Sequence, residues 1–224
     1  MADAIGQILA LGVVVGLSPV PIIAVVLMLG TPRARVNGPA FLLGWVLGLA
    51  AVGTIVVVAA GAAGASDDQE PATWASVLQL ALGALLVLLA AKQWRGRPRG
   101  DQEPEMPKWM RTIDHFTPAR SFAIAIALSA INPKNLVLTL AAGAAIAGTG
   151  ADTTGQAVAL AIFVLVGTLG TGLPVAAYFL LGARATRMLD ELKNWMAANN
   201  ATIMAVLCLV IGAKLIGDGI SGLG

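Results

Sequence analysis

The stretch "SAINPKN" at residues 129–135 interrupts an otherwise apolar run that extends over residues 121–148. Proline removes a backbone donor and clashes with the preceding turn, so Pro133 predicts a break in a helix. If this helix crosses a bilayer, Lys134 costs roughly 2.5–3.5 kcal/mol unless its ammonium meets water, carbonyl oxygens or an anion. The stretch therefore predicts a membrane span that is broken near its centre and carries a buried charge.

The composition of the whole chain is that of a membrane protein. Of its 224 residues, 58% are hydrophobic and 12% are charged, whereas typical soluble domains carry about 25% charged residues. The net charge of +2 gives no basis for a nucleic-acid partner. A single cysteine, Cys208, cannot form an intrachain disulfide, and a single histidine, His115, cannot form a histidine cluster for a metal. We therefore expect no metal, no cofactor, no catalytic residue and no enzymatic activity.

Six apolar segments approach the ~20 residues that a helix needs to cross the hydrocarbon core of a bilayer. They predict an all-α membrane protein with six transmembrane helices. The first and fourth segments are longer than a straight crossing requires, and both contain central prolines. The predicted spans comprise residues 5–29, 38–60, 74–91, 121–148, 155–181 and 201–216.

Basic residues are concentrated in the loops after the first, third and fifth spans. On the other side of the predicted membrane, Lys214 is the only basic residue of the sequence. The positive-inside rule therefore places these three loops in the cytoplasm and both termini outside. The basic residues of the three loops and their flanks are Arg33, Arg35, Lys92, Arg95, Arg97, Arg99, Lys108, Arg111, Arg120, Arg184, Arg187 and Lys193.

The two halves of the sequence resemble each other weakly. Pro19 aligns with Pro133, and "NGPAFLLGWVLG" at 37–48 aligns with "TGQAVALAIFVL" at 154–165. Because each half has three spans, the second half must enter the membrane from the opposite face. Inverted repeats of this kind are typical of secondary transporters, whose sites lie near the midplane. The predicted organisation is a first three-helix repeat at 1–95, a basic cytoplasmic linker with an amphipathic helix at 96–120, and a second three-helix repeat at 121–224.

The counterpart of the opening stretch in the first half is "GLSPVPII" at residues 16–23. Pro19 and Pro21 remove two backbone donors, and the freed carbonyls must find partners or line a cavity. The prolines produce either a packed kink or a functional break. Lys134 binds an anionic ligand, extends its ammonium to the membrane surface, or pairs with the freed carbonyls. The predicted binding residues at the two breaks are Ser18, Pro19, Pro21, Asn132, Pro133, Lys134 and Asn135.

Glycine-rich patterns occur in the second and fifth predicted spans. The fifth carries "GTLGTGLP" at 167–174, which could act as a hinge or could pack closely against another helix. Gly44 and Gly48 in the second span have the GxxxG spacing, which allows a homodimer. The predicted hinge or packing residues of the fifth span are Gly167, Thr168, Gly170, Thr171, Gly172 and Pro174.

Two stretches in the basic loops are amphipathic and predict helices that lie at the membrane interface. Both place their apolar residues on one helical face and could contact anionic lipid headgroups. The apolar faces comprise Met106, Trp109, Met110, Ile113 and Phe116 in the first stretch, and Met188, Leu189, Leu192, Trp195 and Met196 in the second.

The motifs "LSPVPI" and "INPKN", within six spans, resemble the LysE transporter superfamily over nearly the whole chain. The residues of these two motifs are most similar to those of the GAP/Sap-like group of actinobacteria, the peptidoglycolipid and sulfolipid addressing proteins. The superfamily usually has Pro-Gly-Pro in span 1, whereas this chain has Val20 between the two prolines, which fits the glycolipid branch better than the amino-acid exporters. The resemblance implies export across a bacterial plasma membrane and an inverted repeat of three plus three helices.

Three functions follow as alternatives from the motifs and this resemblance. The first is an exporter or flippase of an anionic amphiphile, such as a cell-envelope glycolipid or lipid precursor, by alternating access around a midplane site. The second is an exporter of small solutes such as amino acids. The third is an accessory subunit of a larger glycolipid export complex. The expected partners are therefore membrane lipids, an anionic lipid or small-molecule substrate, and, in the third case, an export machine.

Overall fold

The computed structural model describes residues 2–64, 73–97 and 108–223, and all regular structure within these residues is helical. The predicted all-α fold is confirmed. Arg99 and Met106, which belong to the predicted linker, lie outside the described residues. The elements are α1 (Ala2–Gly16), α2 (Pro19–Leu29), α3 (Ala34–Gly64), α4 (Thr73–Arg95), the 3₁₀ helix η1 (Lys108–His115), α5 (Pro118–Ile126), the π-helix η2 (Ala127–Ile131), α6 (Pro133–Ala147), α7 (Thr153–Leu181) and α8 (Ala183–Ser221).

Six membrane crossings are present among the described residues if each bent helix pair counts as one span. The helices α3, α4, α7 and α8 are each long and apolar enough to cross a membrane. The α1–α2 pair bends by 48° at Pro19, and the pair formed by α5–η2 and α6 bends by 61° at Pro133. Both breaks therefore lie at the prolines from which they were predicted.

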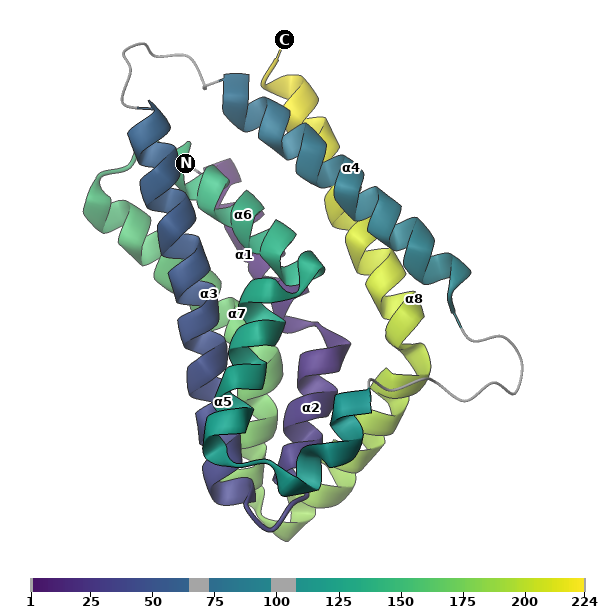
Figure 1. Cartoon of the computed structure of the whole chain (residues 1–224). Coiled ribbons are helices and arrows are strands. Elements are labelled where there is room, and N and C mark those ends of the chain that lie inside the picture. The colour runs from purple at the N-terminus through teal and green to yellow at the C-terminus, as the bar shows by residue number, and fades with distance from the viewer. Residues whose placement is uncertain (1, 65–72, 98–107, 224) are drawn as a thin grey trace.

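The two halves of the chain run in opposite directions through the molecule. In Figure 1, α1 and α2 descend from the end that carries both termini, whereas α5 and α6 ascend towards that end. The most extensive packing joins one half to the other, because α4 packs on α8, α3 on α5 and α1 on α7. In an inverted repeat, α1 corresponds to α5 and α3 corresponds to α7. The packing of α3 on α5 therefore corresponds to the packing of α7 on α1, and both contacts are present.

The last span differs from its prediction. The sequence suggested an interfacial helix followed by a separate span at 201–216, but α8 is one helix of 39 residues, whose path changes direction part-way along (Figure 1). The connecting residues contain no glycine or proline, and Asn199 Nδ2 donates to the Trp195 carbonyl at 2.9 Å within the same helix. Nothing in this stretch therefore interrupts the helical hydrogen bonds.

The short helix η1 also differs from its prediction as an interfacial helix. Its apolar residues Met110 and Ile113, together with Phe116, are buried within the hydrophobic core. The helix packs against α2, and Asn37 Nδ2 on α3 donates to the Phe116 carbonyl at 3.0 Å. The described apolar side chains of this stretch, Met110, Ile113 and Phe116, are therefore covered by the protein itself.

Candidate functional site

The break between α1 and α2 rearranges the helical hydrogen bonds of the turn before Pro19. Pro19 has no N–H to donate to the Val15 carbonyl, so Ser18 turns back and supplies both its N–H, at 3.2 Å, and its hydroxyl, at 2.6 Å. In an uninterrupted helix the Ser18 N–H would instead bind the Val14 carbonyl. The Val14 oxygen is therefore free to accept from elsewhere.

The second break follows the same pattern at the equivalent position. The Asn132 N–H donates to the Ala127 carbonyl at 3.0 Å, five residues back, which closes the π-helix η2. It therefore does not bind the Leu128 carbonyl, four residues back. Asn135 Nδ2 donates to that Leu128 oxygen at 2.8 Å instead. In each half, the freed carbonyl lies four residues before the residue that precedes the first proline.

The two breaks meet at the Lys134 ammonium. Lys134 Nζ donates to the freed Val14 carbonyl at 2.9 Å and to Ser18 Oγ at 2.6 Å. Ser18 Oγ also lies 3.0 Å from Asn135 Oδ1, so its single proton can go to that oxygen or to the Val15 carbonyl. Lys134 and Ser18 are each 3% exposed and Asn135 is fully buried. The first half of the chain thus supplies the acceptors for a lysine from the second half.

The charge of Lys134 is surrounded by neutral partners. Among the side chains that the structure describes, ion pairs join Lys193 to Asp190 at 2.9 Å and Lys214 to Asp218 at 2.7 Å. Both pairs are within α8 and partly exposed, and neither includes Lys134. A carbonyl dipole and a hydroxyl stabilise an ammonium only in part, because they do not neutralise its charge. The arrangement leaves a net positive charge where the two broken spans cross.

The seven residues predicted from the breaks divide into two groups. Ser18, Lys134 and Asn135 lie together and form the cluster described above. Asn132 instead caps α6, because its Oδ1 accepts from the Lys134 N–H at 3.1 Å. The prolines shape the backbone: Pro19 and Pro21 are buried in α2, and Pro133 is exposed at the start of α6.

Sequence reasoning did not name the two carbonyls that complete the cluster. They belong to Val14 and Leu128, whose side chains carry no polar group. A usable signal exists, since proline displaces the helical hydrogen bonds of the turn before it. A freed backbone carbonyl is therefore expected four residues before the residue that precedes the proline.

The glycine-rich part of α7 forms close packing contacts. A Cβ atom on Gly170 would overlap the backbone oxygen of Gly16 in α1. One turn earlier, the Gly167 carbonyl accepts from Trp45 Nε1 at 3.1 Å. The helix remains continuous through Pro174, and the hinge role predicted for this segment stays a prediction. The contacts favour its packing role.

Threonines in the same segment bond within α7. Thr168 Oγ1 donates to the Val164 carbonyl at 2.6 Å, and Thr171 Oγ1 donates to the Thr168 carbonyl at 3.2 Å. Gly172 is different from Gly170, because the nearest atom to an added Cβ is a methyl carbon of Thr168 at 3.6 Å. The closest backbone approach in this segment is therefore at Gly170, whereas Gly172 has ordinary van der Waals space around it.

The GxxxG pair of α3 is also used inside the chain. A Cβ atom on Gly44 would overlap the Phe122 carbonyl of α5, and one on Gly48 would overlap the Ser129 hydroxyl of η2. This face of α3 is therefore covered by the second half of the same chain. A homodimer would need a different surface.

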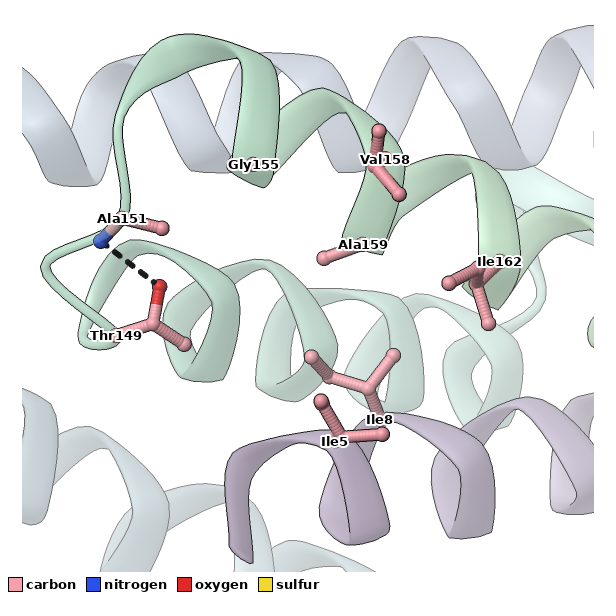
Figure 2. A pocket seen from close by; sticks show the side chains of 8 residues that line it. All are labelled: Ile5, Ile8, Thr149, Ala151, Gly155, Val158, Ala159 and Ile162. Atoms are coloured by element: carbon pink, nitrogen blue, oxygen red, sulfur yellow. Dashed lines mark hydrogen bonds between the residues drawn. The ribbon is translucent and has the colours of Figure 1, made fainter. Parts of the chain in front are cut away.

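An apolar cavity of about 160 Å³ lies away from the Lys134 cluster, between the first turns of α1 and the start of α7. Figure 2 shows the residues that line it. The backbone N–H of Ala151 donates to Thr149 Oγ1 at 3.2 Å. None of the residues predicted at the breaks lines this cavity. Its lining consists of Ile5, Ile8, Thr149, Ala151, Gly155, Val158, Ala159 and Ile162.

Comparison with known proteins identifies the family of the chain. No match was found among curated proteins or among solved structures. The family described as Sap, sulfolipid-1-addressing protein, matches residues 8–221, which include both broken spans and the Lys134 cluster. This multi-pass membrane protein therefore belongs to the Sap, sulfolipid-1-addressing protein, family.

Proposed function

We propose that the protein moves an anionic amphiphile, such as a cell-envelope glycolipid or its precursor, across the bacterial plasma membrane. The observation that supports this proposal is the buried Lys134 ammonium, which has only neutral partners where two broken spans cross. An anionic headgroup would neutralise the positive charge of Lys134, which the Val14 carbonyl and the Ser18 hydroxyl do not. The family's description as sulfolipid-addressing is consistent with such a headgroup.

The described conformation corresponds to a closed state in this proposal. Lys134 and Ser18 are almost fully buried, so a headgroup reaches them only when one half of the molecule moves relative to the other. The surface of the second break is close, because Ile131 is 70% exposed and Pro133 is exposed beside it. Lys134 directly follows Pro133 in the chain, so the second break connects this exposed surface to the buried lysine.

Reconstituted protein provides the test. Liposomes with and without the protein would contain either a fluorescent sulfated glycolipid or a fluorescent phosphatidylcholine, and an impermeant quencher would report probe movement between leaflets. We expect the protein to accelerate movement of the sulfated probe and to leave the zwitterionic probe near its rate in empty liposomes. Equal rates for the sulfated probe with and without protein would contradict the proposal.

A second candidate, an accessory subunit of a glycolipid export complex, is favoured by the enclosure of Lys134. Its ammonium donates to Val14 O and Ser18 Oγ of the first half, as it would if the lysine only joined the two halves. Copurification of an export pump, combined with no lipid movement in liposomes, would favour this candidate over transport.

The orientation of the protein is also proposed. The turn between α2 and α3 and the corner between α7 and α8, which carry Arg33, Arg184 and Arg187, lie at the end of the molecule opposite the two termini (Figure 1), so we infer that this basic end faces the cytoplasm. Alkaline phosphatase, which folds only outside the cytoplasm, should be active when fused after Leu223 and inactive when fused after Arg97. The reverse pattern of activities would overturn the inferred orientation.

A further inference from the structure

A cavity of about 500 Å³ opens at the basic end of the molecule, and none of the residues predicted at the two breaks lines it. It lies between the first turn of α3 and the corner where α7 meets α8, which are close together at the bottom of Figure 1. Its volume falls within the range of roughly 300–1,000 Å³ that small-molecule sites occupy. The lining residues are Arg35, Tyr178, Phe179, Gly182 and Thr186.

The polar groups of this cavity favour an anion. Arg35 is exposed and takes part in neither of the ion pairs found in the described ranges. Its guanidinium offers forked donors that match the oxygens of a phosphate or sulfate. Thr186 and Tyr178 add hydroxyl groups to the lining. The carboxylate of Asp190, near a small adjoining cavity, is already paired with Lys193.

The backbone at the corner adds to the positive potential. Gly182 precedes α8 with φ of 55°, a left-handed conformation that favours glycine, and it has no side chain to cap the helix. The first amide groups of α8 therefore lack a side-chain acceptor, and the helix dipole adds partial positive charge there. Arg184 and Arg187 follow, and both are exposed.

Apolar residues beside the cavity distinguish a lipid from a soluble anion. Phe179 is 50% exposed, Leu180 is 81% exposed and Leu181 is 48% exposed. These three consecutive residues end α7 immediately before the corner, so a hydrophobic surface adjoins the cationic cavity. A membrane lipid has the complementary arrangement, in which an anionic headgroup is joined directly to acyl chains.

We propose that this cavity binds the phosphate or sulfate ester headgroup of an anionic lipid in the leaflet at the basic end. Arg35 contacts the ester oxygens, Thr186 and Tyr178 contact hydroxyl groups of the headgroup, and the acyl chains lie along Phe179 and Leu180. The site is separate from Lys134 and does not depend on transport, so it can be tested in protein that moves no lipid.

The test measures the stabilisation of the detergent-purified full-length protein by phosphatidylinositol, because a ligand that binds the folded state raises Tm. Phosphatidylcholine and inorganic phosphate are the parallel probes. Arg35→Gln removes the proposed contact, and Arg33→Gln removes an exposed arginine that lies two residues earlier and does not line the cavity. Tm without added lipid shows that each variant is folded.

We expect phosphatidylinositol to raise Tm of the wild type and of Arg33→Gln at similar concentrations. Arg35→Gln should need about tenfold more lipid, as expected for the loss of one charge-assisted hydrogen bond. The proposal is overturned if Arg35→Gln responds like the wild type, or if Arg33→Gln loses as much as Arg35→Gln. It is also overturned if phosphatidylcholine or inorganic phosphate gives the same stabilisation as phosphatidylinositol.

Discussion

Replacing Lys134 with methionine is expected to slow movement of the sulfated probe more than tenfold and to lower the Tm of the protein. Methionine has a similar shape but cannot donate to the Val14 carbonyl or to Ser18 Oγ. The Val14 oxygen then has no donor, because the Ser18 N–H that would bind it in a regular helix is directed to Val15. A buried acceptor left without a partner costs about 1–3 kcal/mol.

Two further lysine variants separate the charge from its structural effect. Lys214→Met removes a partly exposed lysine of α8 that is paired with Asp218, and exposed pairs contribute only about 0–1 kcal/mol. It should leave both measurements near those of the wild type. Lys134→Arg retains the positive charge, and we expect it to retain more lipid movement than Lys134→Met at a similar Tm. Wild-type rate and Tm for Lys134→Met would show that the ammonium has neither role.

Replacing Gly170 with alanine is expected to destabilise the protein by at least about 2 kcal/mol, towards the upper part of the usual cost of overpacking. The added methyl group would overlap the Gly16 carbonyl. Because both sides of this contact are backbone, no side chain can rotate away, and α1 and α7 must separate. Their separation would also strain the bond from Trp45 Nε1 to the Gly167 carbonyl.

Gly172→Ala is the matched control for Gly170→Ala. It lies two residues away in the same helix, and its added Cβ meets ordinary van der Waals distances. Alanine also has the higher helix propensity, by about 1 kcal/mol, so this variant should be neutral or slightly more stable. Tm and the fraction of monodisperse protein after extraction would measure both effects. Equal stabilities of the two variants would contradict the packing explanation.

The sequence was most informative where local chemistry alone determines the backbone. Pro19 and Pro133 cannot donate the hydrogen bonds of a continuous helix, so the positions of both breaks could be predicted without knowledge of the tertiary structure. The sequence predicted an anionic ligand or freed carbonyls as partners of Lys134. In the structure the ammonium donates to one such carbonyl, that of Val14. That Asn135, rather than Asn132, reaches Ser18 depends on the direction of α6 after its 61° bend.

Other features depend on contacts between distant segments. The apolar face of η1 has the periodicity of an interfacial helix, and only the neighbouring α2 and Asn37 decide that it is buried. Likewise, Gly170 and Gly172 belong to the same glycine-rich motif. They differ in tolerance of a side chain because the Gly16 carbonyl of α1 lies against Gly170 and not against Gly172. The continuity of α8 is a local property, but the amphipathic start and apolar end of this helix suggested two separate elements.

The hydrogen bonds at the two breaks have a consequence for biogenesis. The second break is completed from within its own half, since Asn135 binds Leu128 seven residues away. The first is completed by Lys134, which is 120 residues from Val14. A ribosome therefore delivers the first three spans to the membrane with the Val14 carbonyl still lacking this donor. The N-terminal half reaches its final hydrogen bonding only after the fourth span, which runs in the opposite direction to the first, has been synthesised and inserted.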